Sequence, residues 1–102
     1  MFVRLSSNTA TVHQADDCHR LHVLTDLPDA ELADALHVTG AGRMRADGDI
    51  DLDVGRLFRH AKAVATLADW SEQWERMIDY ATARRWVSAD GAFVRTHVEA
   101  TR

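Results

Sequence analysis

The chain has 102 residues, 46% hydrophobic and 27% charged, proportions that are typical of a single globular domain. Its formal net charge of −4 argues against binding to nucleic acid or to an acidic membrane by overall electrostatic attraction. The single cysteine excludes an intramolecular disulfide, and the absence of a signal-like start or of an apolar stretch of about 20 residues favours a soluble cytoplasmic protein.

The N-terminal part of the chain predicts a small antiparallel sheet. Residues 2–6 and 9–14 are short and rich in valine and threonine, and the polar pair between them predicts a hairpin. Residues 19–25 alternate well enough for a third strand with Leu21 and Val23 facing the core. We therefore expect an antiparallel meander that leaves one face for helices to cover.

Two short helices are expected next. Residues 26–40 carry Pro28 near the start and Gly40 at the end, a combination that is typical of a helix with defined boundaries. Residues 40–49 contain three of the five glycines and no apolar period, which predicts a loop, followed by a brief strand at 49–52.

The second helix is predicted over residues 54–67, with Asp53 as its N-cap. Apolar residues recur in helical register at Val54, Leu57, Phe58, Ala61, Val64 and Ala65. Gly55 weakens the first turn by about 1 kcal/mol relative to alanine.

Residues 69–86 predict the longest helix and the largest apolar surface of the chain. One stripe of the helical period is formed by Trp70, Trp74, Met77, Ile78 and Ala81. Asp69 followed three residues later by Glu72 matches a capping box. We expect the other elements to pack against this stripe.

Asp90-Gly91 predicts a hairpin turn before a strand over residues 92–99. Such a strand would turn Ala92, Val94, Thr96 and Val98 inward and Phe93, Arg95, His97 and Glu99 outward. A helix capped at Asp90 is the alternative. The predicted class is α+β, with a small antiparallel sheet (an N-terminal meander plus a C-terminal strand or hairpin) and about three helices packed on one face.

Two stretches suggest metal ligands but lack the required geometry. On a strand, Cys18 and His22 lie about 13 Å apart, so we expect His19 and His22 to be surface residues beside a buried thiol. The aspartates of residues 47–53 fit a calcium-binding loop in no register, and they favour a solvated strand edge. The sequence therefore predicts no metal and no cofactor.

One basic concentration could place phosphates. It consists of Arg43, Arg45, Arg56, Arg59, His60 and Lys62, and residues 54–68 contain no acid. Because the aspartates at 47–53 would cancel much of this field, nucleic-acid binding through Arg56 and Arg59 is the second alternative function.

Arg95, His97 and Glu99 on one strand face would suit an anionic ligand, and His97 is the candidate for a catalytic base. This first alternative, a ligand-binding protein or an enzyme that uses these residues with or without His22, requires a pocket of at least roughly 300 Å³. No nucleophile elbow, dinucleotide fingerprint or P-loop is present, so the chain is more consistent with a non-catalytic protein.

Our leading prediction is a binding or regulatory module that self-associates, as a homodimer, through the helix of residues 69–86. Trp70, Trp74 and Trp86 exceed what a small core usually needs, and tryptophan is enriched at protein interfaces. Eleven arginines against one lysine, with sixteen alanines, indicate GC-rich coding and a bacterial source.

Overall fold

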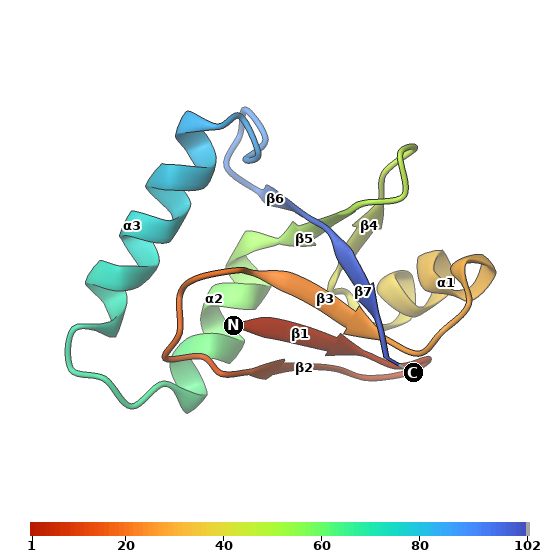
Figure 1. Ribbon diagram of the computed structural model, residues 1–102, viewed down its shortest axis with the longest axis horizontal. Helices are drawn as coiled ribbons and strands as arrows, with labels where there is room; N and C mark the ends of the chain where they lie inside the picture. Colours follow the sequence, from red (N-terminus) through yellow and green to blue (C-terminus); the bar gives the residue numbers. More distant parts are fainter. Residues whose placement is uncertain (102) are drawn as a thin grey trace.

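The computed structural model describes residues 1–101, and within them seven strands form two separate sheets (Figure 1). The strands are β1 (Phe2–Leu5), β2 (Ala10–His13), β3 (His22–Thr25), β4 (Gly42–Met44), β5 (Ile50–Asp53), β6 (Phe93–Thr96) and β7 (Val98–Ala100). The helices are α1 (Asp29–Thr39), α2 (Val54–Val64) and α3 (Trp70–Ala83). The predicted α+β class is confirmed.

The first sheet has the strand order β2-β1-β3-β7 and is not the antiparallel meander that we expected. The predicted β1–β2 hairpin is confirmed as an antiparallel pair, but β3 pairs in parallel with β1, and β7 in parallel with β3. The reason lies in residues 14–21, which bring the chain back past the start of β1. There the N-terminal ammonium donates hydrogen bonds to the carbonyl oxygens of Asp17 (2.6 Å) and His19 (3.3 Å).

The second sheet has the order β4-β5-β6 and is antiparallel throughout. The predicted loop at 40–49 is wrong in part, because it contains β4, a strand of three residues that is too short to show apolar alternation. The strand-edge interpretation of the aspartates is also wrong, because β5 lies at the centre of the sheet. Asp51 is only 8% exposed, and it is paired with Arg43 (3.4 Å) and Arg45 (3.2 Å).

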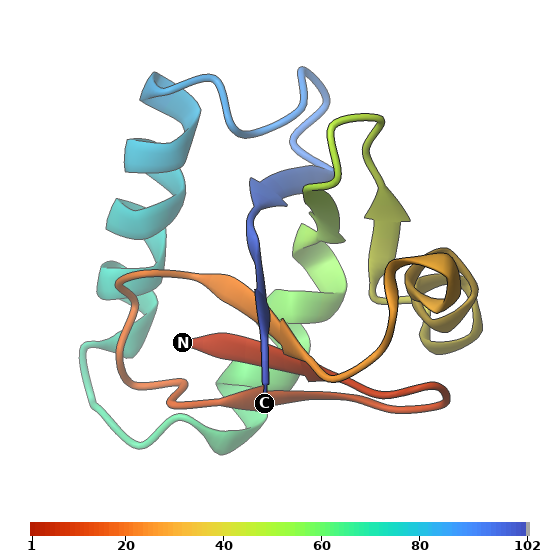
Figure 2. The same ribbon diagram turned by 45° about the vertical axis from the view of Figure 1, so that its right-hand side comes forward.

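The chain passes from one sheet to the other at His97. The extended interpretation of residues 92–99 is confirmed and the helical alternative is excluded, with Val94 and Thr96 buried. The predicted strand is divided, however, because β6 pairs with β5 whereas β7 pairs with β3. Figure 2 shows the chain bending sharply where β6 gives way to β7.

The first two helices have the predicted starts. α1 begins after Pro28 and ends at Gly40, which adopts a left-handed conformation with φ of 71°. Asp53 caps α2 by accepting a hydrogen bond from the backbone N–H of Arg56 at 2.9 Å. α2 contacts both β2 and β5, and α1 contacts β4, so the helices do not share one face of a single sheet.

α2 ends at Val64, three residues earlier than predicted. The backbone N–H groups of Thr66 (2.7 Å) and Leu67 (3.2 Å) donate to the Asp16 carboxylate instead of continuing the helix. The Thr66 hydroxyl donates to the same carboxylate at 2.5 Å. Asp16 therefore links the loop after β2 to the connection between α2 and α3.

We expect the stabilising effect of Asp16 to disappear in acid. Hydrogen bonds from Thr66 and Leu67 hold the pKa of this carboxyl below its usual value of 3.8. A lowered pKa in the folded state stabilises the fold above the unfolded-state pKa, and the effect is lost as pH falls through the folded-state pKa. In urea unfolding, the difference in unfolding free energy between wild type and Asp16→Ala should be largest near neutral pH and should shrink below about pH 4. Asp34→Ala, at an exposed position on α1, is the control. If its difference from wild type in unfolding free energy shrank equally in acid, the stabilising role assigned to Asp16 would be contradicted.

α3 runs from Trp70 to Ala83, inside the predicted range of 69–86. The capping box does not form, because the Asp69 side chain accepts from the Gln73 amide at 3.2 Å and not from a backbone N–H. Trp70 and Trp74 are buried against Phe58 of α2, with ring centroids 5.6 and 5.3 Å from that ring. Among the described residues, no helix is long and apolar enough to cross a membrane.

Candidate functional site

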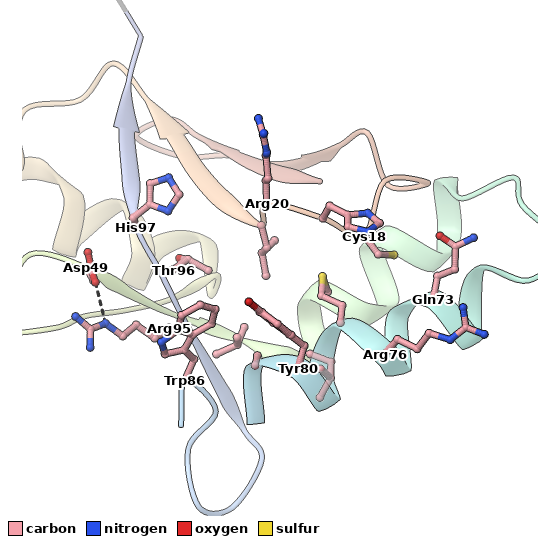
Figure 3. A pocket seen from close by; sticks show the side chains of 16 residues that line it. Cys18, Arg20, Asp49, Gln73, Arg76, Tyr80, Trp86, Arg95, Thr96 and His97 are labelled. Carbon is pink, nitrogen blue, oxygen red and sulfur yellow. Dashed lines mark hydrogen bonds and ion pairs between the residues drawn. The ribbon is translucent and has the colours of Figure 1, made fainter. Parts of the chain in front are cut away.

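The two halves of the apolar stripe on α3 have different environments. Trp70 and Trp74, in the first half, are 3% and 6% exposed and belong to the core. Met77 and Ile78, one to two turns later, are only half-buried, and they line a cavity of about 950 Å³ together with residues of β6 and of the segment that leads into β3. The second half of the stripe therefore packs against the core and also lines the cavity shown in Figure 3.

The walls of this cavity are largely apolar. Leu21 contributes one wall from the segment before β3, Val94 another from β6, and Met77, Ile78 and Ala81 form the helical wall. Apolar walls of this kind, with a few polar groups, are the usual lining of small-molecule sites in proteins.

The position of Trp86 at the cavity follows from how α3 ends. Arg85 adopts a left-handed conformation with φ of 63°, and the N–H groups of Arg85 and Trp86 donate to the carbonyls of Thr82 (3.0 Å) and Ala81 (2.9 Å). These two bonds form a Schellman motif, which turns the chain back over the last turn of the helix. The indole consequently packs edge-on against Tyr80, with centroids 6.0 Å apart.

A few polar groups also reach the cavity. The Tyr80 hydroxyl points toward its centre in Figure 3, and the Thr96 hydroxyl donates to the carbonyl of Ile50 at 3.2 Å. The Cys18 thiol is buried and lies 3.9 Å from the carbonyl oxygen of Ala15. Burial raises the pKa of this thiol, which keeps it protonated and makes it a poor nucleophile.

The rim of the cavity is positively charged in an acidic protein. Arg20, Arg76 and Arg95 line it together with one carboxylate, that of Asp49. Arg95 donates to Asp49 at 2.8 Å and pairs with Asp47 at 2.9 Å. Within residues 1–101, Arg20 and Arg76 form no ion pair, and Figure 3 shows both side chains extending outward from the cavity lining.

The three residues that we predicted on one strand face are only partly together. Arg95 and His97 line the cavity, but Glu99 lies beyond the point where the chain changes sheet. The Glu99 carboxylate contacts His22 at 3.1 Å and His97 at 3.3 Å. The imidazoles of His22 and His97 stack with centroids 5.6 Å apart, so His97 lies between the cavity and the side chains of His22 and Glu99.

The predicted interface residues differ strongly in exposure. Trp70 and Trp74 are core residues, whereas Trp86 is 39% exposed and sits at the cavity. Self-association remains a prediction, and in this fold Trp86 is the member of the three that has indole surface to offer to a partner.

The predicted basic concentration is divided between two elements. Arg43 and Arg45 are paired with Asp51 on the second sheet, and they do not extend the surface of α2. Arg56 and Arg59 lie on α2, where burial and these two cations lower the pKa of His60.

The residues that suggested a metal site are spread over different environments. Cys18 is buried, His19 is exposed and bonded to Asp17 at 3.1 Å, and the His22 side chain is mostly buried, contrary to our surface prediction. No group of three metal-ligating side chains in residues 1–101 could hold an ion.

Sequence reasoning missed several residues of the cavity, notably Leu21 as a wall residue, Tyr80 and Arg76. Tyr80 lies outside the stripe, and no periodicity could indicate that Trp86 folds back toward it.

Comparison with family models, with curated proteins and with solved structures found no match to this chain.

Proposed function

We propose that the protein binds a small molecule with an apolar body and an anionic group in the cavity beside α3. The main support is the cavity of about 950 Å³, lined by the second half of an apolar helical stripe. It lies at the upper end of the volumes usual for small-ligand sites, about 300–1,000 Å³. Ligand binding is the first alternative function that the sequence predicts, through Arg95, His97 and Glu99. The present proposal keeps ligand binding but assigns it to other residues.

In this proposal, each part of the lining has a separate role. Met77, Ile78 and Trp86 bury the apolar body of the ligand, which the hydrophobic effect stabilises by about 25 cal/mol per Å² of apolar surface removed from water. Arg20 and Arg76 attract the anionic group, because a cavity with low-dielectric walls concentrates the field of the charges that line it.

Two dyes with the same aromatic body test this proposal. N-phenyl-1-naphthylamine is neutral, and 8-anilinonaphthalene-1-sulfonate adds one sulfonate. We expect both to bind with an increase in fluorescence, and the sulfonate to bind more tightly. Arg76→Gln should lower the affinity for the sulfonated dye only, by roughly twofold to fivefold, which corresponds to the free energy of an exposed ion pair.

Ile78→Trp places a larger side chain inside the cavity, fills part of its volume and should weaken binding of both dyes. Val38→Trp is the matched control, because Val38 is exposed on α1 and lies away from this cavity. Circular dichroism establishes that both variants are folded. Unchanged dye binding by folded Ile78→Trp would refute the proposal, as would a dimer in sedimentation experiments that Trp86→Ala abolishes.

A further inference from the structure

The strand β2 forms one edge of the first sheet, with β1 as its neighbour in that sheet. The Ser6 N–H donates to the Thr9 carbonyl at 2.8 Å and closes the hairpin. Because hydrogen-bonded and non-hydrogen-bonded pairs alternate in an antiparallel ladder, Thr11 bonds to β1, whereas Ala10 and Val12 direct their backbone groups away from it. This edge therefore offers backbone donors and acceptors to a further strand.

A second cavity, of about 540 Å³, runs along this edge. Residues 8–12 all line it in unbroken succession. Successive side chains of a strand point to opposite faces, so a cavity that touches Ala10, Thr11 and Val12 of β2 in succession borders the backbone edge of that strand. α1 contributes Val38 and Thr39 to the other walls, and α2 contributes further residues.

Arg56 of α2 already contacts the free edge. Its guanidinium Nη2 donates to the Ala10 carbonyl at 3.4 Å, on the side where a neighbouring strand would donate an N–H. Within residues 1–101, the outward N–H and carbonyl of Val12 have no hydrogen-bond partner. The edge is thus partly occupied by a side chain that an incoming strand can displace.

The charge and polarity of the groove indicate what would fit it. Arg56 and His60 line the groove, and none of its lining residues carries a carboxylate. Arg59 lies on the same helix, and residues 54–68 contain no acid. Val38 and Val64, on opposite walls, are 58% and 57% exposed.

We propose that this groove binds an extended, acidic peptide segment of a partner protein, which adds to β2 as a fifth strand of the first sheet. Backbone hydrogen bonds to Val12 would supply affinity, as in other cases of strand addition to a sheet edge. Aspartate or glutamate side chains would face Arg56 and His60 of α2, and the aliphatic side chains that alternate with them would point to the other side, toward Val38 of α1. The site is separate from the cavity beside α3.

The probe is a fluorescein-labelled hexapeptide in which valine and aspartate alternate, and its anisotropy reports binding. The same peptide with lysine in place of aspartate should not bind. A version with every backbone nitrogen methylated keeps its charge but has no N–H donor on either edge of the strand, so it should also fail to bind. Equal binding of either comparison peptide would overturn the proposal.

On the protein side, Val12→Pro removes the outward N–H, which makes no ladder bond, and proline is accepted at such edge positions. We expect the peptide affinity to fall about tenfold, the effect of one lost hydrogen bond. Val12→Ala keeps the N–H and should change the affinity by less than about twofold. If Val12→Pro does not fold, the methylated peptide tests the same strand pairing through the other set of bonds, those that peptide N–H groups donate to the Val12 carbonyl.

Two further measurements exclude other occupants of the groove. A single-stranded oligonucleotide that displaces the peptide, with affinity falling steeply as salt rises, would show a nucleic-acid site instead. Dimerisation that Val12→Pro abolishes would show that β2 pairs with a second copy, and it would equally overturn the peptide proposal.

Discussion

Trp70→Ala should cost about 3–5 kcal/mol of unfolding free energy, which is a large part of the stability of a small domain. The side chain is 3% exposed and packs against Phe58 and Trp74, with ring centroids 5.6 and 5.7 Å away. Its Nε1 donates to the Ala15 carbonyl at 2.6 Å, and truncation leaves that buried acceptor with only the weak contact from the Cys18 thiol at 3.9 Å. Urea unfolding followed by circular dichroism measures the loss.

Two variants separate the contributions to this effect. Trp70→Phe keeps most of the aromatic packing and removes the hydrogen bond, so it should cost about 1–3 kcal/mol. Trp86→Ala removes a more exposed indole outside the core and should cost less than Trp70→Ala. If Trp70→Ala and Trp86→Ala destabilised the fold equally, α3 would not be anchored by its first half.

Gly42→Ala should be the most damaging single-methyl change among the five glycines. A Cβ at Gly42 would overlap the backbone oxygen of Asp51 on the neighbouring strand, and it would come within 3.0 Å of the Leu52 Cα. Backbone atoms at the centre of a sheet cannot move aside as a flexible side chain can. We expect a loss of more than about 2 kcal/mol, measured by urea unfolding, or loss of the β4–β5 pairing.

Gly55→Ala is the matched control and should have the opposite sign. The atoms nearest to an added Cβ are Arg59 Nη1 at 3.4 Å and Asp53 Oδ1 at 3.6 Å, both in side chains. Alanine is favoured over glycine in a helix by about 1 kcal/mol, so this variant should be more stable than wild type. Destabilisation by both substitutions to a similar degree would contradict the close approach at Gly42.

Features of the fold that depend on neighbouring residues could be predicted from the sequence. The β1–β2 hairpin, the Asp53 cap and the Gly40 terminus each follow from a few consecutive residues. The parallel pairing of β3 could not be predicted, because it depends on how residues 14–21 wrap around the N-terminal ammonium. The alternation that predicted β3 is the same for parallel and antiparallel neighbours.

The candidate site could be predicted only in part for a similar reason. The stripe on α3 was visible in the sequence, but the sequence does not show where the core ends along it. The outward direction of Arg95 was predicted from alternation, whereas its partners Asp47 and Asp49 lie more than 40 residues away in the chain. Trp86 reaches the cavity because Arg85 adopts a conformation usually associated with glycine, which no local pattern indicated.

The passage of the chain between sheets at His97 determines which changes in length this region tolerates. Val94 and Thr96 are buried in one sheet, and Val98 packs against the core from the other. The alternation of inward and outward side chains therefore continues without interruption from β6 into β7. Inserting or deleting one residue near His97 would reverse inside and outside in one sheet relative to the other. Natural variants of this segment are therefore expected to differ by substitution and to keep its number of residues constant.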